Sequence, residues 1–308
     1  MKKQLQLMVA LMVLGLSVSA QKEYKLAKSS GKLNLNLSGA TVEGYNGGEI
    51  IFSSPASEKE QVDERAKGLK AVNSSGFKDN TGLGLDVTVK GEDINVNPVS
   101  LTDDRRFKIR VPQNIKVVFT NNSSMYQDSL TLKNLKSEIE VSVNFNEVKL
   151  ENNTGPVNVK TLNGSVDAVF AGEIKGPISI VSVHGHVDVA LPKTAKVSLE
   201  AGTNYGKIYA AEGLNIAIEK EAVEKTDKPA TGVAYTTNGS VLFSGLVSGT
   251  GAKASTSTLT TTQGGNRVLS AINISMRKES ENIKGKINGG GTVLILKSNH
   301  DSIYIREK

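Results

Sequence analysis

The amino-acid sequence predicts an all-β fold, a single β-solenoid in which short strands stack in rungs of about 18–21 residues. Three observations predict this class. A strand-turn-strand-turn phrase repeats in the centre of the chain, apolar and polar residues alternate within the strands, and Gly or Asn recurs between them. Alternation with a period of two is typical of half-buried strands, and short strands that cannot bury their own apolar row are typical of stacked repeats.

The repeat occupies residues 155–192. GPVNV at 155–159 returns as GPISI at 176–180, and GSVDA at 164–168 returns as GHVDV at 185–189. Both returns come after 21 residues. A fixed interval of this kind indicates that each return stacks on the phrase before it.

The same interval leads from Ile178 to Leu199 and from Val187 to Ile208, so the next rung is expected to begin there. A competing interpretation is a sandwich of antiparallel hairpins that turn at Asn163-Gly164 and His184-Gly185. Because hairpins do not require a fixed 21-residue return, the repeat favours the solenoid.

The alternation assigns every second residue to the core. The expected interior residues are Val157, Val159, Val166, Ala168, Ile178, Ile180, Val187 and Val189. The residues expected to face water are Asn158, Asp167, Ser179 and Asp188. Glycine is expected at the corners because it adopts a positive φ without steric cost.

Strands continue on the N-terminal side, where Leu33, Leu35 and Leu37 alternate with asparagines and where LGLDVTVKGEDINVNP and RRFKIRVPQNIKVVF follow. One short helix is expected near residues 58–70. Ser57-Glu58-Lys59-Glu60 has the form of a capping box, and apolar residues follow it at helical spacing.

The C-terminal half contains two expected exposed loops, a charged and Pro-broken one near 219–232 and a Ser/Thr/Gly-rich one near 248–266. Strands resume in GTVLILKSNHDSIYIRE, where Val293, Ile295, Ile303 and Ile305 alternate with their neighbours. The NGGGT segment at 288–292 precedes a strand and not a helix, so it is interpreted as a tight corner.

Residues 1–20 have the three parts of a secretory signal peptide, with two lysines, an apolar run and small residues before Gln21. We therefore expect a signal peptide over 1–20 and one exported β-solenoid domain over 21–308. Its location would be periplasmic, at the cell surface or extracellular. With no Cys, the chain has neither a disulfide nor a lipid-bearing cysteine, and no further stretch has the length and hydropathy of a transmembrane segment.

The formal net charge is +6, or +4 after removal of the two signal-peptide lysines, and the charges are interspersed. Nucleic acid is therefore not an expected partner.

The chain has few residues with a pattern suited to chemistry. His184, His186 and Asp188 flank a turn, and Asp167 occupies the equivalent phase one rung earlier. Such residues could form a metal site or a pair of catalytic carboxylates, but exposed strand faces are polar in any case. The charge cluster at 103–106 is interpreted as a solvated loop. We therefore expect no catalytic, cofactor-binding or metal-binding residue, and no cofactor.

Several stretches resemble a bacterial putative adhesin family with β-strand repeats, a domain of unknown function related to the head domain of putative autotransporter adhesins. The matching stretches are ATVEGYNGGEIIF, FKIRVPQNIKVVF, the Gly-x-Val-x-Val segments and INGGGTVLILKSNHDSIYIREK. The resemblance implies a secreted or periplasmic β-solenoid that binds a cell-surface or matrix polymer or protein, and it supplies no catalytic residues.

The sequence leaves two functions open. The first is a non-enzymatic binding or structural module that acts through an extended polar face. The alternative is a carbohydrate-active enzyme, a polysaccharide lyase or hydrolase on a β-helix scaffold.

Overall fold

The computed structural model describes residues 22–54, 64–100, 106–125, 127–219, 233–237, 240–244 and 281–308. The expected signal peptide, most of the charge cluster at 103–106 and the expected loop near 248–266 lie outside these residues, as does all but the first residue of the loop near 219–232. Among the described residues, no helix is long and apolar enough to cross a membrane.

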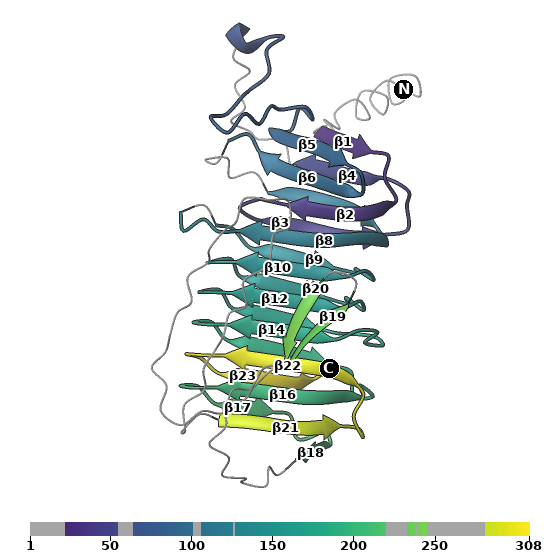
Figure 1. Ribbon diagram of the computed structural model, residues 1–308, viewed down its shortest axis with the longest axis vertical. Coiled ribbons are helices and arrows are strands. Elements are labelled where there is room, and N and C mark those ends of the chain that lie inside the picture. Colours follow the sequence, from purple (N-terminus) through teal and green to yellow (C-terminus); the bar gives the residue numbers. More distant parts are fainter. Residues whose placement is uncertain are drawn as a thin grey trace, which may run out of the picture.

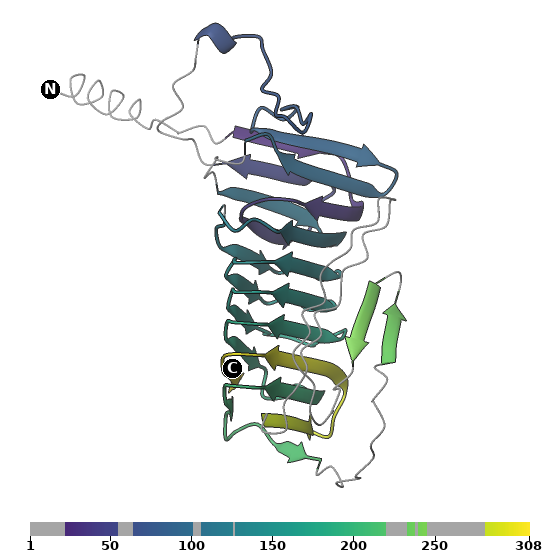
Figure 2. The ribbon, with the colours of Figure 1, turned by 60° about the vertical axis from the view of Figure 1, so that its left-hand side comes forward.

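The described chain is all-β and is dominated by two large mixed sheets (Figures 1 and 2). In edge-to-edge order, the ten-stranded sheet contains β1 (Lys22–Leu26), β4 (Ile50–Ser54), β7 (Phe107–Pro112), β3 (Ala40–Tyr45), β9 (Leu130–Lys133), β11 (Val148–Glu151), β13 (Val166–Val169), β15 (Val187–Leu191), β23 (Ile303–Glu307) and β17 (Ile208–Ala210).

The eleven-stranded sheet contains, in order, β18 (Ile216–Ile218), β21 (Glu281–Ile287), β16 (Val197–Thr203), β22 (Thr292–Ser298), β14 (Ile178–Ser182), β12 (Val157–Thr161), β10 (Ile139–Val143), β8 (Asn114–Asn121), β2 (Ser30–Leu35), β6 (Asp93–Pro98) and β5 (Leu85–Lys90). A separate antiparallel pair consists of β19 (Val233–Thr237) and β20 (Ser240–Ser244).

In the centre of the chain, consecutive strands belong to opposite sheets, and each pairs in parallel with the next strand of its own sheet. Ile139 is paired with Val157, which is paired with Ile178, and Val166 is paired with Val187. The repeat found in the sequence therefore stacks in register. The alternative of antiparallel hairpins is wrong for this region, because β10, β12 and β14 are all parallel.

One apolar core fills the space between the two sheets. The eight residues expected in the interior are all at most 1% exposed and belong to this core. Asp167 is exposed, and Ser179 and Asp188 are partly exposed, as expected. The expectation for Asn158 is wrong, because this residue is only 8% exposed although it lies on the side of its strand opposite to the core.

The corner glycines are required for a reason different from the expected one. None of the described glycines at 155, 164, 176, 185 and 206 has a positive φ. Instead, a Cβ atom on Gly164 would lie 1.8 Å from the carbonyl oxygen of Asn146, and one on Gly185 would lie 2.2 Å from that of Gly164. Glycine is present because the corner backbones of neighbouring levels nearly touch.

A column of buried hydroxyl groups follows the same corner. Ser182 Oγ donates to the carbonyl oxygen of Gly164 at 2.9 Å and accepts the Gly185 N–H at 2.8 Å. The residues of this column, all 0% exposed, are Thr161, Ser182, Ser298 and Thr203. The hydroxyls satisfy polar backbone groups that the turn withdraws from water, so each corner is tied to the level beside it.

The C-terminal strands lie between two earlier levels of the stack. β22 separates β14 from β16, and β23 separates β15 from β17 (yellow in Figure 1). Ile178 is therefore paired with Leu294, and Val187 with Ile303. The expectation that residues 199 and 208 lie beside residues 178 and 187 is wrong, because β22 and β23 occupy that place. These two strands come more than 80 residues after β16 and β17 in the sequence.

Antiparallel strands bound the parallel stack at both ends, namely β1, β4 and β5 at one end and β21 and β18 at the other. The short helix expected near 58–70 is not formed in the described part of that segment. Residues 64–66 form only a 3₁₀ turn, and 55–63 lie outside the described residues. In β22 the core side chains are Leu294 and Leu296, whereas Val293 is 45% exposed, so the phase expected for this strand is shifted by one residue.

Candidate functional site

Three of the four residues singled out in the sequence, Asp167, His186 and Asp188, lie on the outer face of the ten-stranded sheet. Asp167 and Asp188 are direct neighbours on β13 and β15. His186 Nε2 is 3.1 Å from Asp167 Oδ1. The structure thus brings three of the four chosen side chains together on one face.

Each of the two carboxylates has a basic partner. Arg306 Nε donates to both oxygens of Asp188 at 2.8 Å, and its Nη2 lies 2.7 Å from Oδ2. Asp167 is held by His186. Arg306 comes from β23, so the C-terminal insertion supplies this partner.

Two tyrosines extend the same face. Tyr304 is paired with Asp188 on one side and with Tyr209 on the other. The two rings are stacked, with centroids 5.3 Å apart and planes 8° apart, and Tyr209 is 49% exposed. His186 meets Tyr304 edge-on at 6.3 Å. We refer to Asp167, His186, Asp188, Tyr209, Tyr304 and Arg306 as the charged–aromatic patch.

His184 is separated from this patch and belongs to a second group of rings at the corner of the stack. Its ring is stacked on that of His300, with centroids 4.5 Å apart, and His300 is stacked in turn on Tyr205 at 4.9 Å. Among the described residues, no group of three or more His, Asp or Glu side chains is placed to hold a metal ion.

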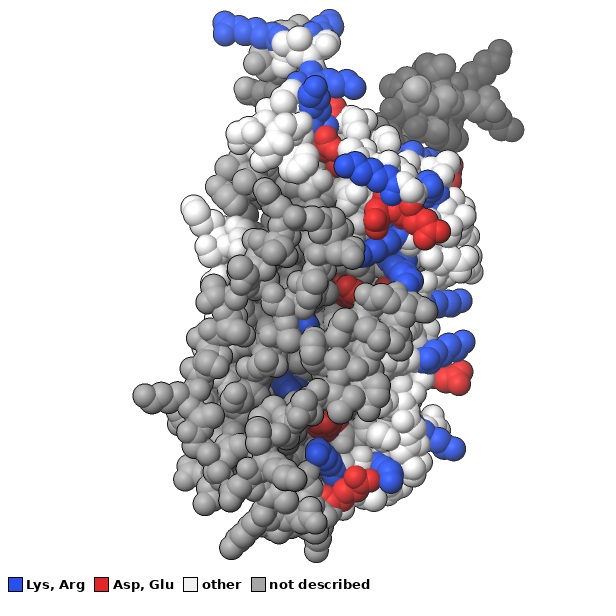
Figure 3. All heavy atoms as spheres, in the orientation of Figure 1, with Lys and Arg blue, Asp and Glu red and all other residues white. Residues whose placement is uncertain are grey.

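The patch is one end of a longer row across the sheet. Residues in direct register on eight neighbouring strands make up this outer row: Lys108, Thr41, Thr131, Lys149, Asp167, Asp188, Tyr304 and Tyr209. All eight side chains are at least partly exposed. Seven intervals of about 4.8 Å give the row a length of about 34 Å. On the side of the molecule shown in Figure 3, described basic and acidic side chains likewise occur close together.

The outward side chains of the eleven-stranded sheet are less exposed. Val181 and Ile295 are 8% and 5% exposed, and Lys297 forms a 3.1 Å ion pair with Glu200. Withdrawal from water lowers the pKa of Lys160, although nearby Glu140 acts in the opposite direction. The ten-stranded sheet is therefore the face with the more accessible polar groups.

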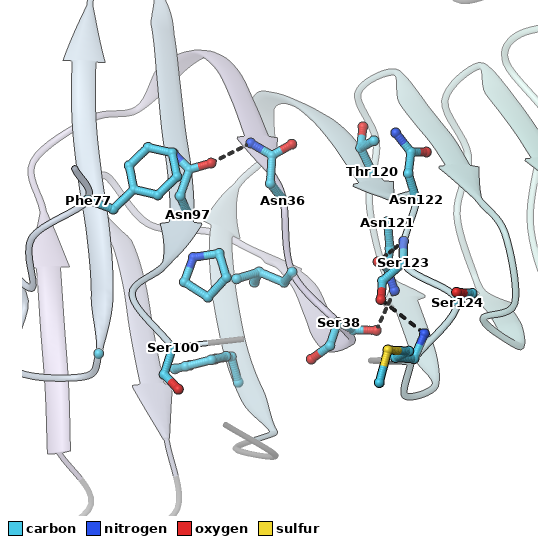
Figure 4. A pocket seen from close by; sticks show the side chains of 15 residues that line it. Asn36, Ser38, Phe77, Asn97, Ser100, Thr120, Asn121, Asn122, Ser123 and Ser124 are labelled. Carbon is cyan, nitrogen blue, oxygen red and sulfur yellow. Dashed lines mark hydrogen bonds between the residues drawn. The ribbon is translucent and has the colours of Figure 1, made fainter. Parts of the chain in front are cut away.

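A pocket of about 580 Å³ lies at the end of the stack opposite to the charged–aromatic patch, near the C-terminal ends of β2, β6 and β8 in the eleven-stranded sheet (Figure 4). Asn36 Nδ2 donates to Asn97 Oδ1 at 2.8 Å on one side of it. Residues 120–125 form the other side, and Phe77 and Ser38 also contribute. The pocket was not predicted from the sequence, because its lining comes from segments that have no recognisable motif.

The aromatic residues were not predicted either, although the sequence contains a signal for them. SVHGHVD at 182–188, TNYGKIY at 203–209 and SNHDSIY at 298–304 have hydroxyl, ring, apolar and outward-facing residues at matching places. These segments are direct neighbours in the order 182–188, 298–304 and 203–209. Comparison of the three segments would have aligned His184, His300 and Tyr205 at one position. It would also have aligned Asp188, Tyr304 and Tyr209 at another.

No protein-family model and no curated protein matches the chain. Among solved structures, it is similar to the crystal structure of a putative cell adhesion protein from Clostridium sporogenes, with a TM-score of 0.40 and 15% identity over 94% of this chain and 100% of that one. It is also similar to the crystal structure of a putative adhesin from Bacteroides fragilis, with a TM-score of 0.35 and 9% identity over 94% of this chain and 96% of that one. At these scores neither likeness assigns the chain to a family.

Proposed function

We propose that the chain is an exported β-solenoid that serves, like an adhesin, as a non-enzymatic binding module in the periplasm or at the cell surface. Its ligand would be a cell-surface or matrix polymer or protein. The in-register parallel pairing of β8 to β15 supports one continuous coil as the finer description of the fold. The sequence resemblance to the adhesin family supports the adhesin-like role.

The outer row is the observation that carries this proposal. It presents charged, hydroxyl and aromatic groups at a spacing of one strand over about 34 Å and ends in the charged–aromatic patch. A regular row of this length suits many weak contacts with an extended ligand, which is how the long faces of repeat proteins bind. Stacked tyrosines at its end add apolar surface to the polar contacts.

The charge pairing favours binding over the alternative of a carbohydrate-active enzyme. Glycoside hydrolysis requires one carboxyl group to be a protonated acid while the other is ionised. Asp188 is bound to the Arg306 guanidinium through two nitrogens, and Asp167 is bound to His186. Both carboxyl groups would have to leave these partners before they could act on a glycosidic bond.

A binding screen of the purified chain against insoluble polysaccharides and matrix proteins tests the proposal. We expect retention without release of reducing ends or unsaturated products. Lys149→Ala and Tyr209→Ala should each weaken binding about two- to fivefold, because each removes one of many contacts. Lys116→Ala, on the other sheet, is the matched control and should have no effect. Product release that is abolished by Asp167→Ala or Asp188→Ala would establish the enzyme instead.

Export requires a separate experiment. Protein recovered from the periplasm or culture medium of an expressing bacterium should begin at Gln21, as determined by N-terminal sequencing and intact mass. Recovery only from the cytoplasm, with Met1 retained, would overturn this part of the proposal and leave the binding test unaffected.

A further inference from the structure

The pocket of Figure 4 is built by the pairing of three parallel strands. Leu35 on β2 is paired with Val96 on β6 and with Phe119 on β8. The next residues along the three strands are Asn36, Asn97 and Thr120. They therefore lie side by side in one row near the C-terminal ends of these strands. All three line the pocket.

The lining formed by the described residues has polar groups but no charge. Among the fifteen lining residues, the side chains carry only amides, hydroxyls and apolar groups. The amide- and hydroxyl-bearing residues are Asn36, Ser38, Asn97, Ser100, Thr120, Asn121, Asn122, Ser123 and Ser124. Because none of these fifteen residues is a base or an acid, none of them compensates the desolvation of a phosphate, a carboxylate or an ammonium group.

Several of these polar groups are available to a ligand. Within the described part of the chain, Asn97 Nδ2, Thr120 Oγ1, Ser124 Oγ and the side-chain amide of Asn122 make no hydrogen bond. Amides and hydroxyls together offer both donors and acceptors, which is the complement of a ligand that itself carries hydroxyl groups.

Apolar surface accompanies the polar groups. The half-buried ring of Phe77 lies beside Asn97 (Figure 4). Met125, 77% exposed, also lines the pocket. A cavity of about 580 Å³ with this mixture falls within the range of roughly 300–1,000 Å³ that is common for small-molecule sites. Aromatic and thioether groups pack against the C–H faces of a sugar ring, while amides bind its hydroxyls.

We propose that this pocket binds a neutral saccharide, one without carboxylate, sulfate or phosphate groups. The pocket lies at the end of the stack opposite to the charged–aromatic patch, and none of its described lining residues belongs to the outer row. It therefore does not depend on the proposed function. It would allow the protein to hold a short neutral glycan independently of an extended ligand on the ten-stranded sheet.

The test is ligand-observed saturation-transfer NMR and calorimetry on the full chain. The probes are cellobiose, maltose, lactose and N,N′-diacetylchitobiose, with digalacturonate as the acidic counterpart. We expect binding of at least one neutral disaccharide with a millimolar or lower Kd, and at least tenfold weaker binding of digalacturonate.

Two pairs of variants locate the binding. Ser124→Trp fills the pocket from an exposed position and should weaken binding at least tenfold, whereas Ser29→Trp, also exposed and outside the pocket, should not change it. Asn122→Ala should weaken binding about three- to tenfold, and the exposed Asn163→Ala should not. All four variants should fold, because none of them alters a core residue, and melting curves check this.

The proposal is overturned if no neutral disaccharide binds, if digalacturonate binds more tightly, or if Ser124→Trp binds as the unmodified chain does. Tyr209→Ala separates the two proposals. It should leave disaccharide binding unchanged even though it weakens binding of an extended ligand to the outer row.

Discussion

The insertion of the C-terminal strands can be tested with engineered disulfides, because the chain contains no Cys of its own. In the structure, Asp188 is paired with Tyr304, and Tyr209 lies one strand further away. Neighbouring strands are about 4.8 Å apart, whereas strands two places apart are about 10 Å apart. Since a disulfide requires Cα atoms within about 4.4–6.8 Å, Asp188→Cys combined with Tyr304→Cys should crosslink, and Asp188→Cys combined with Tyr209→Cys should not.

The crosslink should also stabilise the fold. It closes a loop of more than 100 residues, for which the chain-entropy model gives about 5 kcal/mol. The two substitutions remove the solvent-exposed ion pair to Arg306. They also remove the stacking of Tyr304, worth about 0.5–1.5 kcal/mol. A net gain of several kcal/mol therefore remains.

Non-reducing electrophoresis and thiol titration measure the crosslink, and melting curves with and without reductant measure its effect on stability. Both double variants lose Asp188 and one tyrosine of the stacked pair, so each controls for the other. A crosslink in the 188/209 variant with none in the 188/304 variant would contradict the strand order and restore the order expected from the 21-residue interval.

Three further predictions concern the core, the corner and a loop. Val187→Asp should destabilise the fold by several kcal/mol, because it buries a charge between apolar neighbours, whereas Asp188→Val should cost far less; equal melting temperatures would refute the assigned faces. Ser182→Ala should cost about 1–3 kcal/mol by leaving a buried N–H and a buried carbonyl without their partner, while denaturant unfolding of Ser179→Ala should show little change. Burial alone would raise the pKa of Asp79, but hydrogen bonds from the backbone N–H groups of three residues and from one hydroxyl lower this pKa on balance. The ionised Asp79 therefore stabilises the fold at neutral pH, and this stabilisation is lost as the pH falls below about 4. The stability difference between the native chain and Asp79→Asn should therefore shrink on acidification, and a difference that is constant between neutral pH and about pH 3 would contradict this assignment.

The faces of the central strands could be predicted from the sequence because they depend on local alternation. Val157 and Val159 bracket a polar residue, and such a pattern has only one way to bury its apolar side. Asn158 shows the limit of this rule, since a polar residue can be buried on the outward side of a sheet, and alternation does not report how crowded that side is.

The order of the levels could not be predicted, because apolar strands of equal length are equally good neighbours. The alternation around Val187 fits any strand with an apolar residue at the same phase, so it does not choose between Ile303 and Ile208. A constant interval gives no information about a segment that returns from much later in the chain. The candidate sites depend on this order. Arg306 reaches Asp188, and Tyr304 reaches Tyr209, only because the C-terminal strands are inserted.

The insertion also determines when the protein can complete its fold. Residues 178–182 and 187–191 are synthesised more than 100 residues before their partners at 292–298 and 303–307. Until then, β14 and β15 present open edges on which the level formed by β16 and β17 cannot take its final place. Growth of the stack from β8 is therefore expected to pause at β15 until residues 292–307 have been synthesised, so a chain that ends before residue 292 cannot form this level.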